Sequence, residues 1–309
     1  MAETDLSAFA SASIARGSKS FAAASRLFDA RTRESVVLLY AWCRHCDDVV
    51  DGQEAGSPMR AGGSRPAAEA IEALRRDTAL AFEGCTRGLH PAFAALGEVV
   101  RRHGIDRSLA QEHLAGFAMD AEGRTYRTLD DLMLYCWRVA GVVGVMMARI
   151  MGVSDEETLD RAADLGLAFQ LTNIARDMVD DAKAGRVYVP TDWLRAEGMC
   201  PHDLADAAFA APIARLRKRL VDEAEHYYGS ARLGIDALPR RCAWAVGTAW
   251  GVYRMIGLKL VEKGADAFSY RVSTGRAEKI GQIAGGTRIA LWRGGRTVPR
   301  PAHLWTRPR

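Results

Sequence analysis

The chain has 309 residues, of which 49% are hydrophobic and 26% charged, and its 42 basic and 38 acidic side chains leave a net charge of +4. This composition supports a large buried core, so intrinsic disorder is excluded, and the near balance of charge does not indicate a nucleic-acid-binding protein. The six cysteines lack the spacing of a secreted disulfide framework. Cys43 and Cys46 form a CxxC, which inside a helix is more typical of buried packing than of a zinc or redox site.

The sequence shows no targeting or membrane-spanning segment. Residues 1–16 lack a basic region followed by an apolar run, so we expect no signal peptide. The longest uncharged apolar run, residues 139–148, is shorter than the ~18–20 residues needed to cross a bilayer. We therefore expect a cytoplasmic protein, either soluble or peripheral on the inner face of the membrane.

Apolar residues recur at the helical period along most of the chain and almost nowhere alternate in twos. This pattern predicts helices over residues 5–15, 18–24, 32–50, 66–83, 91–103, 107–121, 129–151, 155–182, 201–234, 239–263 and 276–292. Loops rich in turn-forming residues are predicted at 52–66 and 121–128, and neither resembles a linker between independent cores. The sequence thus predicts an all-α, single-domain protein over residues 1–290, followed by a basic Arg/Pro/Trp tail at 291–309.

The first chemically informative helix contains YAWCRHCDDVVD, residues 40–51. Tyr40, Arg44, Asp47 and Asp51 lie within about 60° of one another on a helical wheel, whereas Asp48 points about 100° away from Asp47. An arginine on a carboxylate stripe would repel a bare metal ion, but its guanidinium can fork onto phosphate oxygens. The stripe therefore favours a metal ion that arrives with a diphosphate, and Asp48 is expected to be secondary.

A second stripe lies in QLTNIARDMVDDAKAGRVYVP, residues 170–190. Its four members fall within roughly 80° on the wheel and carry the oxygen ligands that a hard cation such as Mg²⁺ prefers. They are Gln170, Asn173, Asp177 and Asp181. The helix must end before Pro190, which places Arg186 and Tyr188 on a following segment that is suited to cover an anionic ligand. One acidic stripe alone is usually a solvated face, but two stripes that each follow an apolar run favour binding.

Three further segments leave alternatives open. GSKSF, residues 17–21, is a helix start with a serine cap or an anion-binding site. The small side of residues 135–150 indicates close helix packing or space for a hydrocarbon. The tail from 288 to 309 has six arginines, two tryptophans and no acidic residue, which fits a solvated tail or attachment to an anionic membrane surface.

Three stretches together resemble the phytoene/squalene synthase family: residues 17–21 with 40–51, residues 135–150 (YCWRVAGVVGVMMARI), and residues 165–190. The one small departure is Asp180, where family members often carry Glu. The resemblance implies an isoprenoid synthase-type helical bundle around a central apolar cavity. It also implies that two geranylgeranyl diphosphates condense head to head, through a cyclopropyl (prephytoene) diphosphate, to 15-cis-phytoene in carotenoid biosynthesis.

The resemblance also assigns residues. The expected metal ligands for Mg²⁺, with Mn²⁺ as a substitute, are Asp47, Asp51, Asn173, Asp177 and Asp181. The expected catalytic residues are the four aspartates of that set with Tyr40 and Arg44. The expected substrate-binding residues are Ser18, Ser20, Phe21, Tyr135, Ala140, Val143, Gly144, Gln170, Arg176, Arg186, Tyr188, Tyr253 and Arg271.

The alternatives concern substrate and class. A dehydrosqualene- or squalene-type synthase would use the same residues on farnesyl diphosphate, but no nicotinamide motif is present and no NADPH is expected. A terpene cyclase would lack the 135–150 stretch and the stripe of Tyr40 and Arg44. A non-catalytic assembly protein with this fold would have lost the aspartates. Other carotenoid-pathway enzymes are conceivable partners.

Overall fold

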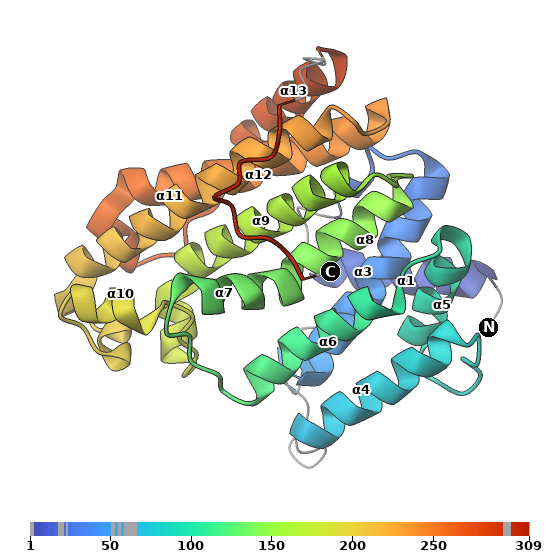
Figure 1. Cartoon of the computed structure of the whole chain (residues 1–309), viewed down its shortest axis with the longest axis horizontal. Coiled ribbons are helices and arrows are strands. Elements are labelled where there is room, and N and C mark those ends of the chain that lie inside the picture. The colour runs from blue at the N-terminus through green and yellow to red at the C-terminus, as the bar shows by residue number, and fades with distance from the viewer. Residues whose placement is uncertain are drawn as a thin grey trace.

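The protein is an almost entirely helical bundle, seen in a computed structural model that describes residues 3–17, 22, 24–50, 53–54, 57–58, 67–292 and 298–308 (Figure 1). Its α-helices are α1 (Glu3–Gly17), α3 (Ala30–Val50), α4 (Ala67–Phe82), α5 (Pro91–His103), α6 (Arg107–Ala121), α7 (Leu129–Cys136), α8 (Val142–Ile150), α9 (Glu156–Lys183), α10 (Thr191–Ala196), α11 (Ala210–Ile235), α12 (Arg240–Lys263) and α13 (Arg276–Leu291). Strands β1 (Gln53–Glu54) and β2 (Ser57–Pro58) form a short antiparallel ladder. The predicted all-α fold is confirmed.

Local sequence explains where several helices begin. The Asp106 side chain accepts a hydrogen bond from the Ser108 amide at 2.7 Å, and that of Asp155 accepts one from the Thr158 amide at 2.8 Å. Thr128 and Asp131 form a reciprocal capping box at the start of α7. Each cap satisfies an amide that the first turn of a helix leaves without a partner, which fixes these starts.

The structure corrects two of the predicted elements and adds one helix. The helix expected over 129–151 is interrupted by a π-helical turn at Trp137–Gly141. The helix expected over 201–234 begins only at Ala210, after two 3₁₀ turns that follow Pro201. The short helix α10 lies in a segment for which no helix was predicted. Most of the helix expected at 18–24 lies outside the described residues.

Helix α9 occupies the centre of the bundle and contacts α7, α8, α11 and α12 (Figure 1). Two glycines permit its close approach to the preceding helices. A Cβ atom on Gly166 would lie 2.7 Å from the Ala140 carbonyl carbon, and one on Gly144 would lie 3.1 Å from that of Ala162. The small residues of the 135–150 stretch therefore do serve close helix packing.

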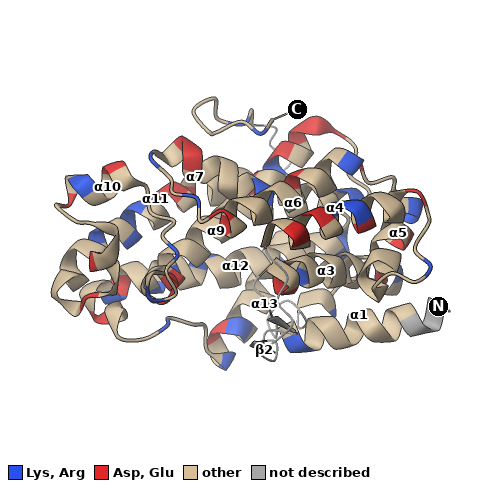
Figure 2. Ribbon diagram, turned by 90° about the horizontal axis from the view of Figure 1, so that it is seen from below, with Lys and Arg blue, Asp and Glu red and all other residues tan. Residues whose placement is uncertain are grey.

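Acidic and basic residues are interspersed along most helices (Figure 2). Within the described part of the chain, one run, Leu129–Ile150, is long and apolar enough to cross a membrane, and 56% of its most apolar window is buried inside the bundle. Residues 298–308 pack against the bundle, with Leu304 buried and Arg300 and Arg307 in ion pairs with α9. The division into a domain at 1–290 and a tail at 291–309 stays a prediction.

Candidate active site

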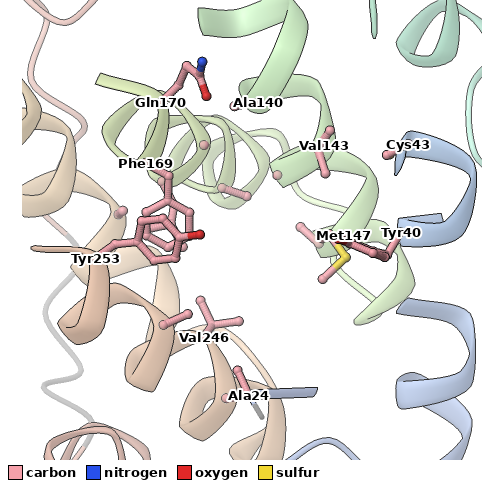
Figure 3. Close-up of a pocket in the computed structure, with 18 of the residues that line it drawn as sticks. Ala24, Tyr40, Cys43, Ala140, Val143, Met147, Phe169, Gln170, Val246 and Tyr253 are labelled. Carbon is pink, nitrogen blue, oxygen red and sulfur yellow. The ribbon is translucent and has the colours of Figure 1, made fainter. Parts of the chain in front are cut away.

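A cavity of about 650 Å³ lies inside the bundle between α3, α8, α9, α11 and α12. Its wall is mainly apolar, and Figure 3 shows Val143, Met147, Phe169 and Val246 around the central space. Ala140 and Gly144 also line it, so the small residues of the π-turn and α8 leave space for a ligand as well as for helix packing. Both interpretations of this stretch therefore apply.

Part of each polar stripe predicted from the sequence lines this one cavity, whereas Asp177 and Asp181 of the second stripe are not among its lining residues. Tyr40, Arg44 and Asp47 reach it from α3, and Gln170 and Asn173 reach it from α9. Asp51, the remaining member of the first stripe, lies outside the described residues, as do Ser18, Ser20 and Phe21. Residues 130 positions apart in the chain thus meet at a common polar region beside an apolar space.

Arg44 is held by two carboxylates of its own helix. Its guanidinium pairs with Asp47 at 2.9 Å and with Asp48 at 2.6 Å, while its Nε atom is buried without a hydrogen-bond partner among the described residues. Asp48 is only 9% exposed. It was expected to be secondary and is not among the residues that line the cavity, but it pairs with Arg44, which does line it.

Asp177 is clamped between two arginines. Arg176 donates from Nε at 2.8 Å, and Arg271 donates two parallel hydrogen bonds at 2.7 and 2.9 Å. Burial acts to raise the pKa of Asp177, but the hydrogen bonds from Arg176 and Arg271 outweigh it and lower that pKa to about 2. Asp177 is therefore ionised throughout the physiological range.

Asp181 has the opposite character. Burial, followed by the negative charge of Asp177, raises its pKa to about 6. A cation bound beside Asp181 would favour its charged form. Asn173 adds a second indication, because its side-chain carbonyl oxygen is buried and has no hydrogen-bond partner among the described residues.

The residues present fit a hard divalent cation that a phosphorylated substrate helps to hold. Asn173 offers a neutral oxygen and the aspartates offer carboxylates, which suit Mg²⁺. Among the described residues, no three His, Cys, Asp or Glu side chains gather into a ready-made metal cluster. Mg²⁺ commonly takes only one or two protein carboxylates, and water and phosphate oxygens complete its shell. A metal site that the protein shares with a phosphorylated substrate therefore does not need three clustered side chains.

A tyrosine cluster forms another wall, and its centre is a residue that the sequence analysis missed. Asp120 of α6 lines the cavity and accepts hydrogen bonds from the hydroxyls of Tyr135 at 2.9 Å and Tyr188 at 3.1 Å. The two tyrosine rings stack with their centres 5.0 Å apart. Tyr188, expected to help cover the ligand, therefore packs on Tyr135. Asp120 directly follows an apolar run (GFAM), and an acidic side chain at that place was the available signal.

Tyr253 lines the cavity from α12 and stacks on Phe169 with ring centres 4.3 Å apart (Figure 3). It lies beside the apolar space, where a π face can stabilise a cation. All six cysteines are free thiols, and burial raises the pKa of Cys43 to about 12, which suits packing rather than metal binding.

Comparison with known proteins indicates the family to which this chain belongs. The family model "Squalene/phytoene synthase" matches residues 14–278. A phytoene synthase from Pseudescherichia vulneris is 49% identical over 309 residues, which is 100% of both chains. A 15-cis-phytoene synthase from Pantoea ananas is 51% identical over 296 residues, 96% of each chain.

A solved structure of a dehydrosqualene synthase in complex with a ligand superposes with a TM-score of 0.78 at 25% identity, covering 92% of this chain and 95% of that one. A squalene synthase from Alicyclobacillus acidocaldarius, at 22% identity and a TM-score of 0.71, supports the fold. The match of the family model to most of the chain and the two full-length relatives show that this chain belongs to the squalene/phytoene synthase family.

Proposed function

We propose that this protein is a prenyltransferase that condenses two geranylgeranyl diphosphates head to head into 15-cis-phytoene and releases diphosphate. The observation that carries the proposal is that parts of two polar stripes, from α3 and α9, line one largely apolar cavity. Relatives that match this chain over nearly their full length at about half identity carry the name 15-cis-phytoene synthase, which supports the choice of product.

The polar region would bind the diphosphate groups. Arg44 presents an unpartnered Nε donor, and Arg271, whose side chain is 58% exposed, can turn from Asp177 to a phosphate oxygen. Asn173, Asp177 and Asp181, with Asp47 and Asp51, would hold Mg²⁺, which when bound neutralises the diphosphate and stabilises the charge that develops on this leaving group.

The apolar wall would guide the chemistry of the carbon chains. When the allylic carbon–oxygen bond breaks, the diphosphate takes the electron pair and leaves an allylic cation. The double bond of the second substrate supplies electrons for the new carbon–carbon bond, and loss of a proton closes a cyclopropane ring. The second diphosphate then leaves with its electron pair, the ring opens, and the final cation loses a proton to give the olefin. A water-excluding wall protects each cation, and the faces of Tyr40, Tyr135 and Tyr253 can stabilise positive charge.

The test uses purified protein with Mg²⁺ and without NADPH, given farnesyl or geranylgeranyl diphosphate in separate reactions. Products are extracted and identified by chromatography and mass. A forty-carbon triene from geranylgeranyl diphosphate supports the proposal, and a thirty-carbon product from farnesyl diphosphate alone moves the substrate to fifteen carbons. No hydrocarbon in either reaction, unchanged by EDTA, would favour a non-catalytic role.

We further propose that α13 contacts an anionic membrane surface, because the hydrophobic substrate and product would partition into the membrane. Ile280, Leu291 and Trp292 are each at least 66% exposed, and Arg276 and Arg288 on the same helix are exposed cations. Lys279 and Ile283 of α13 line the cavity, so this helix lies next to the ligand space. The test is co-sedimentation with lipid vesicles. Binding of the wild type to anionic but not to neutral vesicles, lost in an Ile280→Ser/Leu291→Ser variant, would support this proposal. Equal binding by the wild type and the variant would refute it.

A further inference from the structure

The C-terminal segment 298–308, here called the strap, is fastened to the N-terminal half of α9 (Figure 1, dark red). Arg300 donates two hydrogen bonds to Asp164 at 2.9 and 2.7 Å, and Arg307 pairs with Asp160 and Glu156 at 2.5 Å each. Asp164 is fully buried and also accepts from Ser230 of α11. A buried carboxylate with a bidentate arginine makes this a fixed attachment rather than a loose surface contact.

Arg161 connects the strap to the cavity. Its guanidinium group, which is almost fully buried, donates to the Ser230 carbonyl at 3.2 Å, to Glu157 at 2.8 Å and to the Val298 carbonyl of the strap. Its aliphatic stem lies over Gly234, where a Cβ atom would be only 2.6 Å from the Arg161 Cβ and 3.3 Å from its Cδ. Arg161 and Gly234 both line the cavity.

The contact of Arg161 with Gly234 lies far from the polar region. The cavity-lining residues of α9 run from Thr158 to Asn173. Asn173 lies twelve positions after Arg161 on the helix, which at 1.5 Å per position is roughly 18 Å along the axis. A prenyl chain whose diphosphate is bound near Asn173 would therefore extend its tail toward Arg161.

We infer that Arg161, held in place by the strap, forms the end wall of the hydrocarbon cavity and so limits the length of the prenyl chain that the enzyme accepts. The inference rests on the proposed prenyltransferase function. Arginine suits this position because its methylene groups can face the cavity while its charged head lies among acceptors behind the wall. Three acceptors, from α9, α11 and the strap, bind the guanidinium group and so hold the Arg161 side chain in one position at the end of the cavity.

The sharpest test enlarges or narrows this end of the cavity without touching the polar region. Arg161→Ala removes the stem, and binding of unreactive thiolo-diphosphate analogues with 15, 20 and 25 carbons is then measured by calorimetry. We expect the 25-carbon analogue to gain roughly 10-fold in affinity relative to the 20-carbon one, the scale on which hydrophobic pockets discriminate added carbons. Arg161→Met, which refills the stem, should restore most of the discrimination.

Gly234→Ala tests the same wall in the opposite direction. Its added methyl group must push the Arg161 stem into the cavity, so the 20-carbon analogue should lose affinity relative to the 15-carbon one. Gly229→Ala is the matched control, because Gly229 is an exposed residue of the same helix and a Cβ there meets nothing within 4 Å. This variant should bind all three analogues as the wild type does.

The outcomes separate this inference from the proposed function. Circular dichroism first establishes that each variant folds, and if Arg161→Ala does not, Gly234→Ala alone decides. Equal shifts for all chain lengths, or none, in the folded variants would overturn the end-wall assignment even if the wild type makes a forty-carbon product. A wild type that binds the analogues with a chain-length limit that Arg161 sets, yet forms no hydrocarbon, would keep the end wall and refute the proposed function.

Discussion

The crossing of α9 over the π-turn and α8 shapes the cavity, and Gly166→Ala is the change that tests it. A Cβ on Gly166 would lie 2.7 Å from the Ala140 carbonyl carbon and 2.8 Å from the Gly141 Cα. Both obstacles are backbone atoms of a buried helical segment, so no side chain can rotate away to make room. The two helices must separate for the variant to fold.

The magnitude follows from two opposing effects. Inserting a methyl group into a well-packed interior costs about 1–3 kcal/mol, and backbone obstacles favour the upper end. Replacing glycine with alanine inside a helix returns up to about 1 kcal/mol. We therefore expect a net destabilisation of about 2 kcal/mol, which for a protein of this size lowers Tm by on the order of 4 °C.

Urea unfolding followed by circular dichroism measures the change, with Gly229→Ala as the reference. The reference variant gains the same helix propensity without a clash, so it should match or exceed wild-type stability by a few tenths of a kcal/mol up to ~1 kcal/mol. If Gly166→Ala proved as stable as Gly229→Ala, close backbone approach would not hold this crossing together, and the account of the small-residue stretch would be wrong.

Other changes probe the polar region and the strap. Asp47→Ala or Asp177→Ala should lower kcat by at least ~100-fold with helical content unchanged, the scale of losing one group that stabilises developing charge; near-normal turnover would refute the metal assignment. Excess EDTA should abolish product formation and added Mg²⁺ should restore it, whereas full activity in EDTA would exclude a metal. Arg300→Leu leaves Asp164 buried and unpaired, so unfolding should become easier by about 3–5 kcal/mol. Lys218→Ala, which breaks an ion pair on the surface, should lower the free energy of unfolding by under ~1 kcal/mol. If Arg300→Leu and Lys218→Ala lowered it equally, the structural role of the strap would be contradicted.

The sequence predicted the fold, and the part of each polar stripe that lines the cavity, because both follow from residue spacing within one helix. Tyr40, Arg44 and Asp47 share a helical face whatever surrounds them, and the structure brings that face to the cavity that Asn173 also lines. The π-turn at Trp137–Gly141 was not predictable in the same way. It depends on packing against α9, where Gly166 admits the backbone of the turn.

Residues that act across helices escaped the sequence analysis. Asp120 matters because two tyrosines from other segments converge on it, and neither Tyr135 nor Tyr188 is near it in the chain. Arg300 looked like one of several arginines in a basic tail, and its pairing with Asp164 spans 136 residues. Composition can indicate that such residues are charged, but only the tertiary structure shows which charge each one meets.

The ion pairs toward the two ends of α9 differ in how far their side chains are exposed to solvent. Arg271, which pairs with Asp177, has a side chain 58% exposed, whereas Asp164, which pairs with Arg300, is fully buried. The exposed Arg271 side chain can turn into solvent, so a phosphate group or a metal ion can take its place beside Asp177 while Arg176 stays bonded. A buried pair is costly to break once formed, so the far end stays in place while ligands exchange. Under the proposed function, this difference would let the diphosphate end rearrange with each substrate while the hydrocarbon end keeps a constant length.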